Sequence, residues 1–122
     1  MPGDRILVVD DDDSIRQIVR LCLSEDGYDV CEAPNGEMAL ELLAAWRPEL
    51  ILLDLRMPIM DGWEFARQYQ HTPGPHAPIV AFVAALNAAQ ECAGIEVAGI
   101  LSKPFDLDDL LTAVRTRLPL AT

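Results

Sequence analysis

Short runs of apolar residues alternate along the chain with segments in which apolar residues recur at helical spacing. Two of the runs, residues 6–9 and 50–53, are apolar throughout, which is typical of strands that are covered on both faces of a sheet. The run at residues 28–32 is more polar, so we expect it nearer an edge. Together with two further runs, the pattern predicts five strands, at residues 6–9, 28–32, 50–53, 79–83 and 98–102.

The segments between these runs predict helices. The first segment has apolar residues at i, i+3, i+4, i+7 and i+8, which places them on one helical face: Ile15, Ile18, Val19, Cys22 and Leu23. Similar stripes predict a second helix that ends before Pro48 and a short third helix after Gly62. Residues 84–94 are rich in alanine and predict a short fourth helix. The last helix begins with Asp106 as its N-cap and Asp109 as the capping partner.

Five strand–helix units within 122 residues indicate an α/β fold with a parallel sheet and helices on both of its faces. Crossovers between parallel strands are almost always right-handed, which leaves few possible topologies. The chain shows no internal repeat, low-complexity tract or linker. We therefore expect one domain that spans residues 1–122.

The charge balance limits the class of partner. The chain carries 20 acidic and 9 basic residues, for a net charge of −11. Binding to a nucleic acid backbone or to an anionic membrane surface requires a basic face, so neither is expected as a direct partner. The acidic excess either keeps the domain soluble or belongs to a cation site.

The cysteines and the hydropathy indicate the compartment. The chain has an odd number of cysteines without C-x-x-C spacing: Cys22, Cys31 and Cys92. They therefore form neither a disulfide framework nor a zinc site, and we expect buried, reduced thiols. No charged-then-apolar leader is present, and no apolar stretch approaches the ~20 residues of a membrane span. These features predict that the protein is located in the reducing cytoplasm.

Polar residues follow three of the predicted strands. Ligands of open α/β sheets bind at the carboxyl ends of the strands, so the residues at these positions are candidates for chemistry. Acidic residues follow the first and third strands, and Lys103 with Pro104 follows the fifth. The fourth strand ends in Val83 and Ala84. One edge of the sheet is thus predicted to carry several carboxylates and one ammonium group.

The acidic cluster after the first strand requires a counter-charge. Two carboxylates ~4 Å apart repel each other by about 4 kcal/mol at an effective dielectric constant near 20, so such a group takes up a proton or binds a cation. Oxygen ligands without His or Cys suit Mg²⁺ or Mn²⁺ and not zinc. For Asp12 and Asp13 the favoured interpretation is capping of the helix that follows. Asp10 and Asp11 lie at the strand end and are the metal candidates.

Asp54 ends an apolar strand, where a charged residue is unusual. It could cap the loop that follows. A carboxylate between a metal ion and a lysine could instead attack phosphorus and form an acyl phosphate. In that case the metal would neutralise its charge and Lys103 would stabilise the phosphoryl oxygens.

Three segments together resemble the receiver domain of two-component response regulators, including the chemotaxis-protein-like receivers. They are ILVVDDD at residues 6–12, LLDLRMPIMDG at 52–62 and LSKPF at 101–105. All three occur in the order and at the distances typical of receivers, and the resemblance covers essentially the whole chain. It implies a flavodoxin-like, doubly wound five-stranded parallel sheet of order 2-1-3-4-5 with five helices, which is the strand order known for this fold.

The resemblance also implies a role for each site residue. Asp54 would be the phosphoacceptor, and Asp11 would bind Mg²⁺ directly while Asp10 helps to hold the ion and its waters. The backbone carbonyl of Arg56 would be a further ligand. Lys103 would contact the phosphoryl group. Its bond to Pro104 would be cis.

Two positions depart from the family pattern. Receivers usually carry Thr or Ser where this chain has Val83, and Tyr or Phe where it has Ile100. In the family the hydroxyl and the aromatic ring move together when the phosphoryl group arrives. The stretch from Val83 to Lys103 is also about two residues shorter than usual in the family. The positions that correspond to the switch are Val83, Ala84 and Ile100. Their residues predict that the phosphorylation chemistry is intact and that the conformational switch is altered.

The leading functional hypothesis is a phosphoacceptor module that is not an enzyme with its own substrate. It would take a phosphoryl group from a sensor histidine kinase or a phosphotransfer protein, lose it again by hydrolysis within the domain, and act on a downstream protein. A homodimer is conceivable by resemblance. Two alternatives are a degenerate receiver that binds partners without phosphorylation, and a haloacid-dehalogenase-like phosphatase. Against the phosphatase alternative, the chain lacks the second sequence motif and the cap domain of the haloacid dehalogenases.

Overall fold

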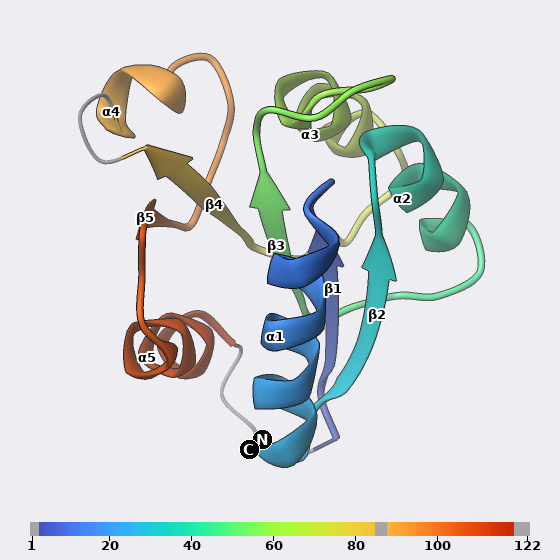
Figure 1. The fold of residues 1–122 in the computed structure, drawn as a ribbon. Coiled ribbons are helices and arrows are strands. Elements are labelled where there is room, and N and C mark those ends of the chain that lie inside the picture. Colours follow the sequence, from blue (N-terminus) through green and yellow to red (C-terminus); the bar gives the residue numbers. More distant parts are fainter. Residues whose placement is uncertain (1–2, 85–87, 119–122) are drawn as a thin grey trace.

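The computed structural model describes residues 3–84 and 88–118, in which five strands alternate with five helices (Figure 1). The strands are β1 (Arg5–Val9), β2 (Asp29–Ala33), β3 (Leu50–Asp54), β4 (Ile79–Ala84) and β5 (Gly99–Lys103). The helices are α1 (Asp13–Glu25), α2 (Gly36–Leu43), α3 (Gly62–Gln70), α4 (Ala88–Glu91) and α5 (Leu107–Arg117). The predicted alternation of strands and helices is confirmed.

The five strands form one parallel sheet of order β2-β1-β3-β4-β5, as the resemblance implied. β2, the most polar of the predicted strands, lies at an edge, which confirms its placement. The pairing places Asp54 opposite Phe82 on β4 and Lys103 opposite Ala84. Because all strands run the same way, the ends of β1, β3 and β5 meet at one edge of the sheet.

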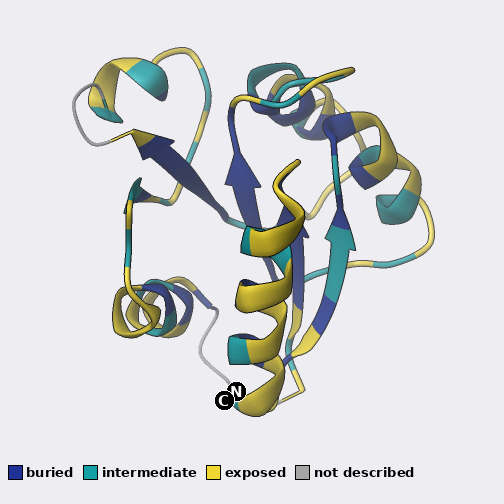
Figure 2. Ribbon diagram, viewed as in Figure 1, coloured by how far each residue is buried: buried dark blue, intermediate teal, exposed yellow. Residues whose placement is uncertain are grey.

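Helices cover both faces of the sheet, and each face has its own apolar core. Residues alternate along β1, so that Ile6 and Val8 pack with α1 and α5, while Leu7 and Val9 pack with α2 and α3. The larger buried side chains of the two cores include Phe82 and Leu110 on the first face and Phe65 and Leu53 on the second. Figure 2 shows the result: the central strand β3 is buried throughout, and the outer face of α1 is exposed.

Side-chain caps fix where the helices begin. A helix leaves its first backbone N–H groups without partners inside the helix, and a side-chain oxygen just before it supplies one. Asp12 accepts from the N–H groups of Ser14 and Ile15, which confirms that it is a cap. Asp106 accepts from the N–H of Asp109, which confirms the predicted start of α5.

Strand and helix ends differ from the predicted ends by a few residues. β2 and β5 each lie one residue later than predicted, because backbone pairing and not hydropathy fixes where a strand ends. β4 extends to Ala84, which removes that residue from the predicted helix at 84–94. Of that helix, α4 comprises Ala88–Glu91, and residues 85–87 lie outside the described residues. α2 ends at Leu43, before Trp46, the last apolar residue of its stripe.

The expectation of buried thiols is correct for Cys92 and wrong for the other two cysteines. Cys22 and Cys31 are half-buried, because α1 has a solvent-facing flank and β2 lies at a sheet edge. Burial nevertheless raises the pKa of all three thiols. Within residues 3–84 and 88–118, no helix is long and apolar enough to cross a membrane.

The backbone of Ile59 predicts a stabilising substitution. Ile59 has φ of 70°, a left-handed conformation that a β-branched residue rarely adopts, and its side chain is 78% exposed. Ile59→Gly removes this strain at the expense of greater chain entropy in the unfolded state, so we expect a net gain of about 0.5–1 kcal/mol in the free energy of unfolding. Urea unfolding of the metal-free protein measures it. Ile59→Ala keeps the Cβ and is the control; an equal gain in both variants would contradict the explanation.

Candidate functional site

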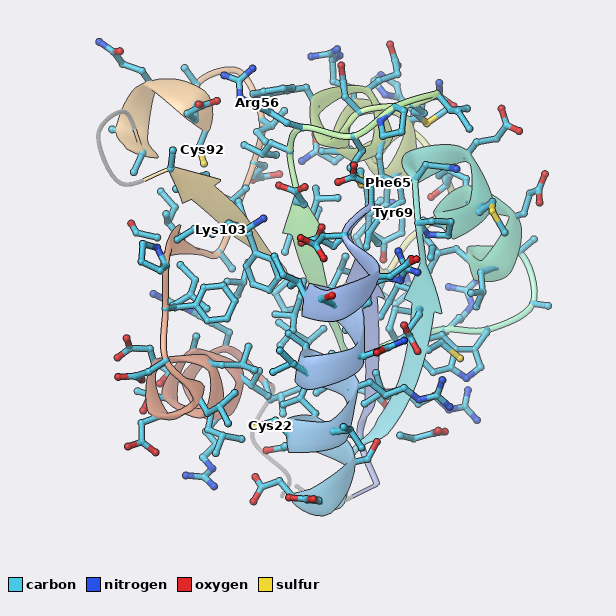
Figure 3. All side chains as sticks on the ribbon, viewed as in Figure 1. Cys22, Arg56, Phe65, Tyr69, Cys92 and Lys103 are labelled. Carbon is cyan, nitrogen blue, oxygen red and sulfur yellow. The ribbon has the colours of Figure 1, made fainter. Side chains whose placement is uncertain are left out.

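The four side chains singled out after the predicted strands lie together at one edge of the sheet. Asp10 and Asp11 directly follow β1, Asp54 is the last residue of β3, and Lys103 is the last residue of β5. β5 lies two strands from β3, so Lys103 must cross β4 to reach the acidic residues. Its ammonium nitrogen lies 5.9 Å from the ring centre of Phe82 on β4, and the side chain extends toward β3 (Figure 3).

The ammonium group of Lys103 lies between two carboxylates. Its Nζ is 3.3 Å from Oδ2 of Asp10 and 3.5 Å from Oδ1 of Asp54. Asp10, Asp11 and Asp54 each offer a carboxylate oxygen, and these oxygens lie within 4.8 Å of one another. One positive charge therefore faces three negative charges, and the cluster has a net negative charge.

Burial opposes ionisation of two of these carboxylates. Asp10 is fully buried and Asp54 is 8% exposed, whereas Asp11 is exposed to solvent. The pKa of Asp54 is raised from 3.8 to about 6, first by burial and then by the charge of Asp10, while Lys103 and the N–H of Arg56 act in the opposite direction. Burial also raises the pKa of Asp10. Both carboxylates thus gain stability from any additional positive charge that enters the cluster.

Every polar atom of Asp10 has a partner. Its N–H donates to the carbonyl of Ala33 at 3.1 Å, and its own carbonyl accepts from Arg16 at 2.6 Å. Its Oδ1 accepts from the N–H of Asp12 at 2.9 Å, and its Oδ2 accepts from Lys103. Asp10 is therefore fixed in place, while its neighbour Asp11 faces solvent.

The three carboxylates fit a hard divalent cation. Mg²⁺ prefers oxygen ligands, binds through one or a few carboxylates and retains several of its waters. Asp10, Asp11 and Asp54 provide such oxygens, one of them on the solvent side. The N–H of Arg56 hydrogen-bonds the Asp54 carboxylate, which places the next part of the loop beside the cluster. The set contains neither His nor Cys, so it does not suit zinc.

The loops around the cluster are tightly constrained. A Cβ on Gly62, the first residue of α3, would lie 2.5 Å from the carbonyl oxygen of Asp54 and 2.7 Å from the Cα of Leu55. Only glycine allows this close approach. The Lys103–Pro104 peptide bond is cis. In the loop after β3, Met57 packs against the α2–α3 face of the core and Pro58 is exposed.

The three predicted switch positions lie on β4 and β5. Val83 is 4% exposed and packs in the core, and Ala84 at the end of β4 is exposed. Ile100 on β5 is 41% exposed. Val83 presents methyl groups, so none of the three residues offers a side-chain hydrogen-bond donor to the acidic cluster.

Three features of the site were not predicted from the sequence. A cavity of about 670 Å³ opens beside Asp54 and Lys103 and is lined mainly by apolar residues of α1, β4 and the start of α5. Arg16 of α1 holds the backbone of Asp10. Arg56 donates to both carboxylate oxygens of Glu91 at 2.9 and 3.1 Å. The cavity and the Arg56–Glu91 pair depend on side chains from elements distant in the chain, and the Arg16 bond depends on a backbone carbonyl six residues away, which no sequence pattern marks.

Comparisons with known proteins agree with this geometry. The response regulator receiver domain family matches residues 6–115. Response regulator MprA of Mycolicibacterium vanbaalenii is 41% identical over 116 residues, which cover 93% of this chain and 50% of that protein. MprA of Mycobacterium avium is 40% identical with the same coverage. The chain thus spans about half the length of the curated relatives it matches.

Solved structures give the same result. The chemotaxis response regulator CheY4 of Vibrio cholerae is 33% identical, with a TM-score of 0.81 over 95% of this chain and 99% of that one. A response regulator receiver domain from Bermanella marisrubri is also 33% identical, with a TM-score of 0.83 over 94% of this chain and 98% of that one. The chain belongs to the response regulator receiver domain family of two-component signalling.

Proposed function

We propose that this receiver domain accepts a phosphoryl group on Asp54 in a Mg²⁺-dependent reaction. The observation that carries the proposal is the position of the Asp54 carboxylate, which ends the central strand with Lys103 at 3.5 Å and two further carboxylates beside it. A purely structural carboxylate would not need two acidic neighbours, since they raise its energy when it is charged. A phosphoacceptor requires this arrangement, because the ion that the acids bind also offsets the charge of the incoming group.

The chain's own residues supply the remaining parts of the reaction. An ionised Asp54 oxygen attacks phosphorus while the bond from phosphorus to the donor nitrogen breaks, and the electron pair of that bond leaves with the nitrogen. Bound Mg²⁺ supplies positive charge against the carboxylates and the transferred group. Lys103, fixed by its bond to Asp10, then pairs with the phosphoryl oxygens in place of the Asp54 carboxylate. Attack by water on the acyl phosphate later restores Asp54, so the domain turns over no separate substrate.

The expected partners follow from this chemistry. A donor that carries a phosphoryl group on nitrogen is a sensor histidine kinase or a phosphotransfer protein, and the phosphorylated domain acts on a downstream protein. The net charge of −11 argues against a direct nucleic acid or membrane partner. The cytoplasmic location and a homodimer stay predictions from the sequence.

We further propose that the switch differs from the usual one. A hydrogen bond to a charged group is worth about 1.5–3 kcal/mol, and Val83 cannot donate one to a phosphoryl group. Ile100 likewise has no ring that could move in response. A contact that does join the site to α4 is the pair of Arg56 and Glu91, whose carbonyl also accepts from the indole N–H of Trp63 at 2.6 Å. Phosphorylation chemistry is retained while the hydroxyl–aromatic coupling is lost.

A second candidate is a receiver that binds partners without phosphorylation. Val83 and Ile100 favour it, because a receiver without the hydroxyl and the aromatic ring of the usual switch would present the same surface to a partner in either state. The phosphatase alternative has less support. Its nucleophile would have to end β1, where Asp10 is hydrogen-bonded at every polar atom and Asp12 is the cap of α1.

Phosphorylation by a small donor separates the first two candidates. With Mg²⁺ and acetyl phosphate or phosphoramidate, we expect intact-protein mass spectrometry to show the gain of one phosphoryl group, because the site needs no second protein for the chemistry. Asp54→Asn and removal of Mg²⁺ by chelation should each abolish the gain. Asp61→Asn, which preserves the cap of α3 in the same loop, is the matched control and should retain it. A wild-type protein that gains no mass would favour the phosphorylation-independent candidate.

The buried charge of Asp54 predicts a pH-dependent gain of stability in Asp54→Asn. A carboxyl group whose pKa is raised by folding destabilises the native state once it ionises, so the metal-free wild type loses stability as pH rises from about 4 to 6. At pH 8 we expect the metal-free variant to be more stable by about 1–2 kcal/mol, less than the full value of the pKa shift because the variant loses the pair with Lys103. Near pH 4 the two should be equal.

Urea unfolding across this pH range measures the difference, and saturating Mg²⁺ should reduce it at pH 8, because the ion stabilises the wild type, which has three carboxylates in the cluster, more than the variant, which has two. A difference in stability that is the same at pH 4 and pH 8 would contradict the role assigned to burial.

The altered switch predicts a local response to phosphorylation. With beryllium fluoride and Mg²⁺ as the phosphoryl mimic, we expect amide chemical shifts in the wild type to change around Asp54 and Lys103. They should change little in the middle of β5 and in α5. The double variant Val83→Thr/Ile100→Tyr restores a donor and a ring, so its shifts should extend along β4 and β5. Ile100→Leu is the control. Large concerted shifts through β4, α4 and β5 in the wild type would count against the proposal.

A further inference from the structure

The guanidinium group of Arg16 joins three elements around the acidic end of β1. Arg16 lies in α1, and its side chain is only 14% exposed. Its Nη1 donates to the main-chain carbonyl of Asp10 at 2.6 Å, and its Nε donates to Glu32 on β2 at 3.2 Å. Its Nη2 donates to the carboxylate of Asp13 at the start of α1. All three of its nitrogens are thus engaged.

The bond to the Asp10 carbonyl fixes the direction of the next residue. That carbonyl belongs to the planar peptide group that joins Asp10 to Asp11. The peptide cannot rotate without breaking a bond to a half-buried, charged donor, so the backbone that directs the Asp11 side chain is held in one orientation. Asp10 is already fixed through its other polar atoms. Arg16 supplies the remaining constraint on the pair.

We propose that Arg16 is a positioning residue for the divalent cation, and that it holds the peptide between Asp10 and Asp11 so that both carboxylates face the ion. The inference rests on the proposed function, because it assigns to Arg16 a part in the same metal-dependent site. Arg16 itself does not touch the ion or the phosphoryl group. Outer groups that orient metal ligands in this way commonly change metal affinity by 10–100-fold when they are lost.

Only arginine meets the geometry. Its planar guanidinium has donors in several fixed directions, which matches three acceptors from β1, β2 and α1. A lysine ammonium is a compact charge and cannot bridge three separated acceptors. Glu32 and Asp13 offset the arginine charge, so the contact orients the backbone of Asp10 without adding an uncompensated positive charge next to the site.

The chain offers a matched control one helical turn away. Arg20 also lies in α1 and donates to the other oxygen of Glu32 at 2.8 Å. Its side chain is 57% exposed, and it donates to Glu32 and not to Asp10. Arg20→Gln therefore removes a charge that Arg16→Lys keeps, together with an ion pair to the same Glu32, but leaves the peptide between Asp10 and Asp11 in place.

The test is a titration of the metal-free 122-residue chain with MgCl₂. Binding is monitored through the amide chemical shifts of Asp10, Asp11 and Asp54. In Arg16→Lys we expect the Kd for Mg²⁺ to rise about tenfold. In Arg20→Gln it should stay within about twofold of the wild type. Urea unfolding without metal runs in parallel, since a merely structural role would lower stability in both variants without separating their Mg²⁺ affinities.

The dependence of phosphorylation on Mg²⁺ gives a second readout. With acetyl phosphate, Arg16→Lys should need about tenfold more Mg²⁺ for half-maximal rate, while its rate at saturating Mg²⁺ stays within about twofold. A Kd for Arg16→Lys within about threefold of the wild type would overturn the inference. So would an equal loss of affinity in Arg20→Gln.

Three further outcomes decide between the inference and the proposed function. Should Arg16→Lys fail to fold, Glu32→Gln keeps the arginine but removes the carboxylate that orients it from β2; weaker Mg²⁺ binding supports the inference, and unchanged binding overturns it. A wild type that binds Mg²⁺ but is not phosphorylated would refute the proposed function and leave the affinity test of Arg16 intact. A wild type that does not bind Mg²⁺ would refute both.

Discussion

The position of one ammonium group between two carboxylates governs the rest of the site. Lys103 lies within 3.5 Å of both Asp10 and Asp54, yet it cannot neutralise the three acidic groups that meet there. The cluster therefore retains negative charge in a place where burial already opposes it, as the raised pKa of Asp54 shows. These charges meet because the parallel sheet brings the ends of β1, β3 and β5 to one edge. The remaining charge is what makes the edge receptive to a cation.

Much of this arrangement could be predicted from the sequence because it depends on strand ends. Wholly apolar runs identified β1 and β3, and in a parallel sheet the residues that follow such strands meet at one edge. Asp12 was recognised as a helix cap for a similarly local reason, since its partners are two and three residues away. The family resemblance added the strand order and the roles of the individual residues.

The sequence was less informative wherever a contact depends on packing between distant elements. The bond from Arg16 to Glu32 joins α1 to β2, and neither residue carries a pattern that points to the other. The short α4 was predicted as a longer segment, because alanine favours helix whether or not a helix forms. Cys22 and Cys31 were expected inside the core, although a residue at the flank of a helix or on an edge strand remains partly open to solvent.

The burial of β3 has a consequence for how a signal leaves this domain. All five of its residues are buried, neighbouring strands flank it on both sides, and the close contact of Gly62 with the backbone of Asp54 and Leu55 closes its end. Asp54 is thus attached to the part of the molecule that is least free to move. A phosphoryl group on Asp54 would therefore have to act through side chains that rearrange around a stationary strand end, and the ion pair of Arg56 with Glu91 is the contact that leads from this end to α4.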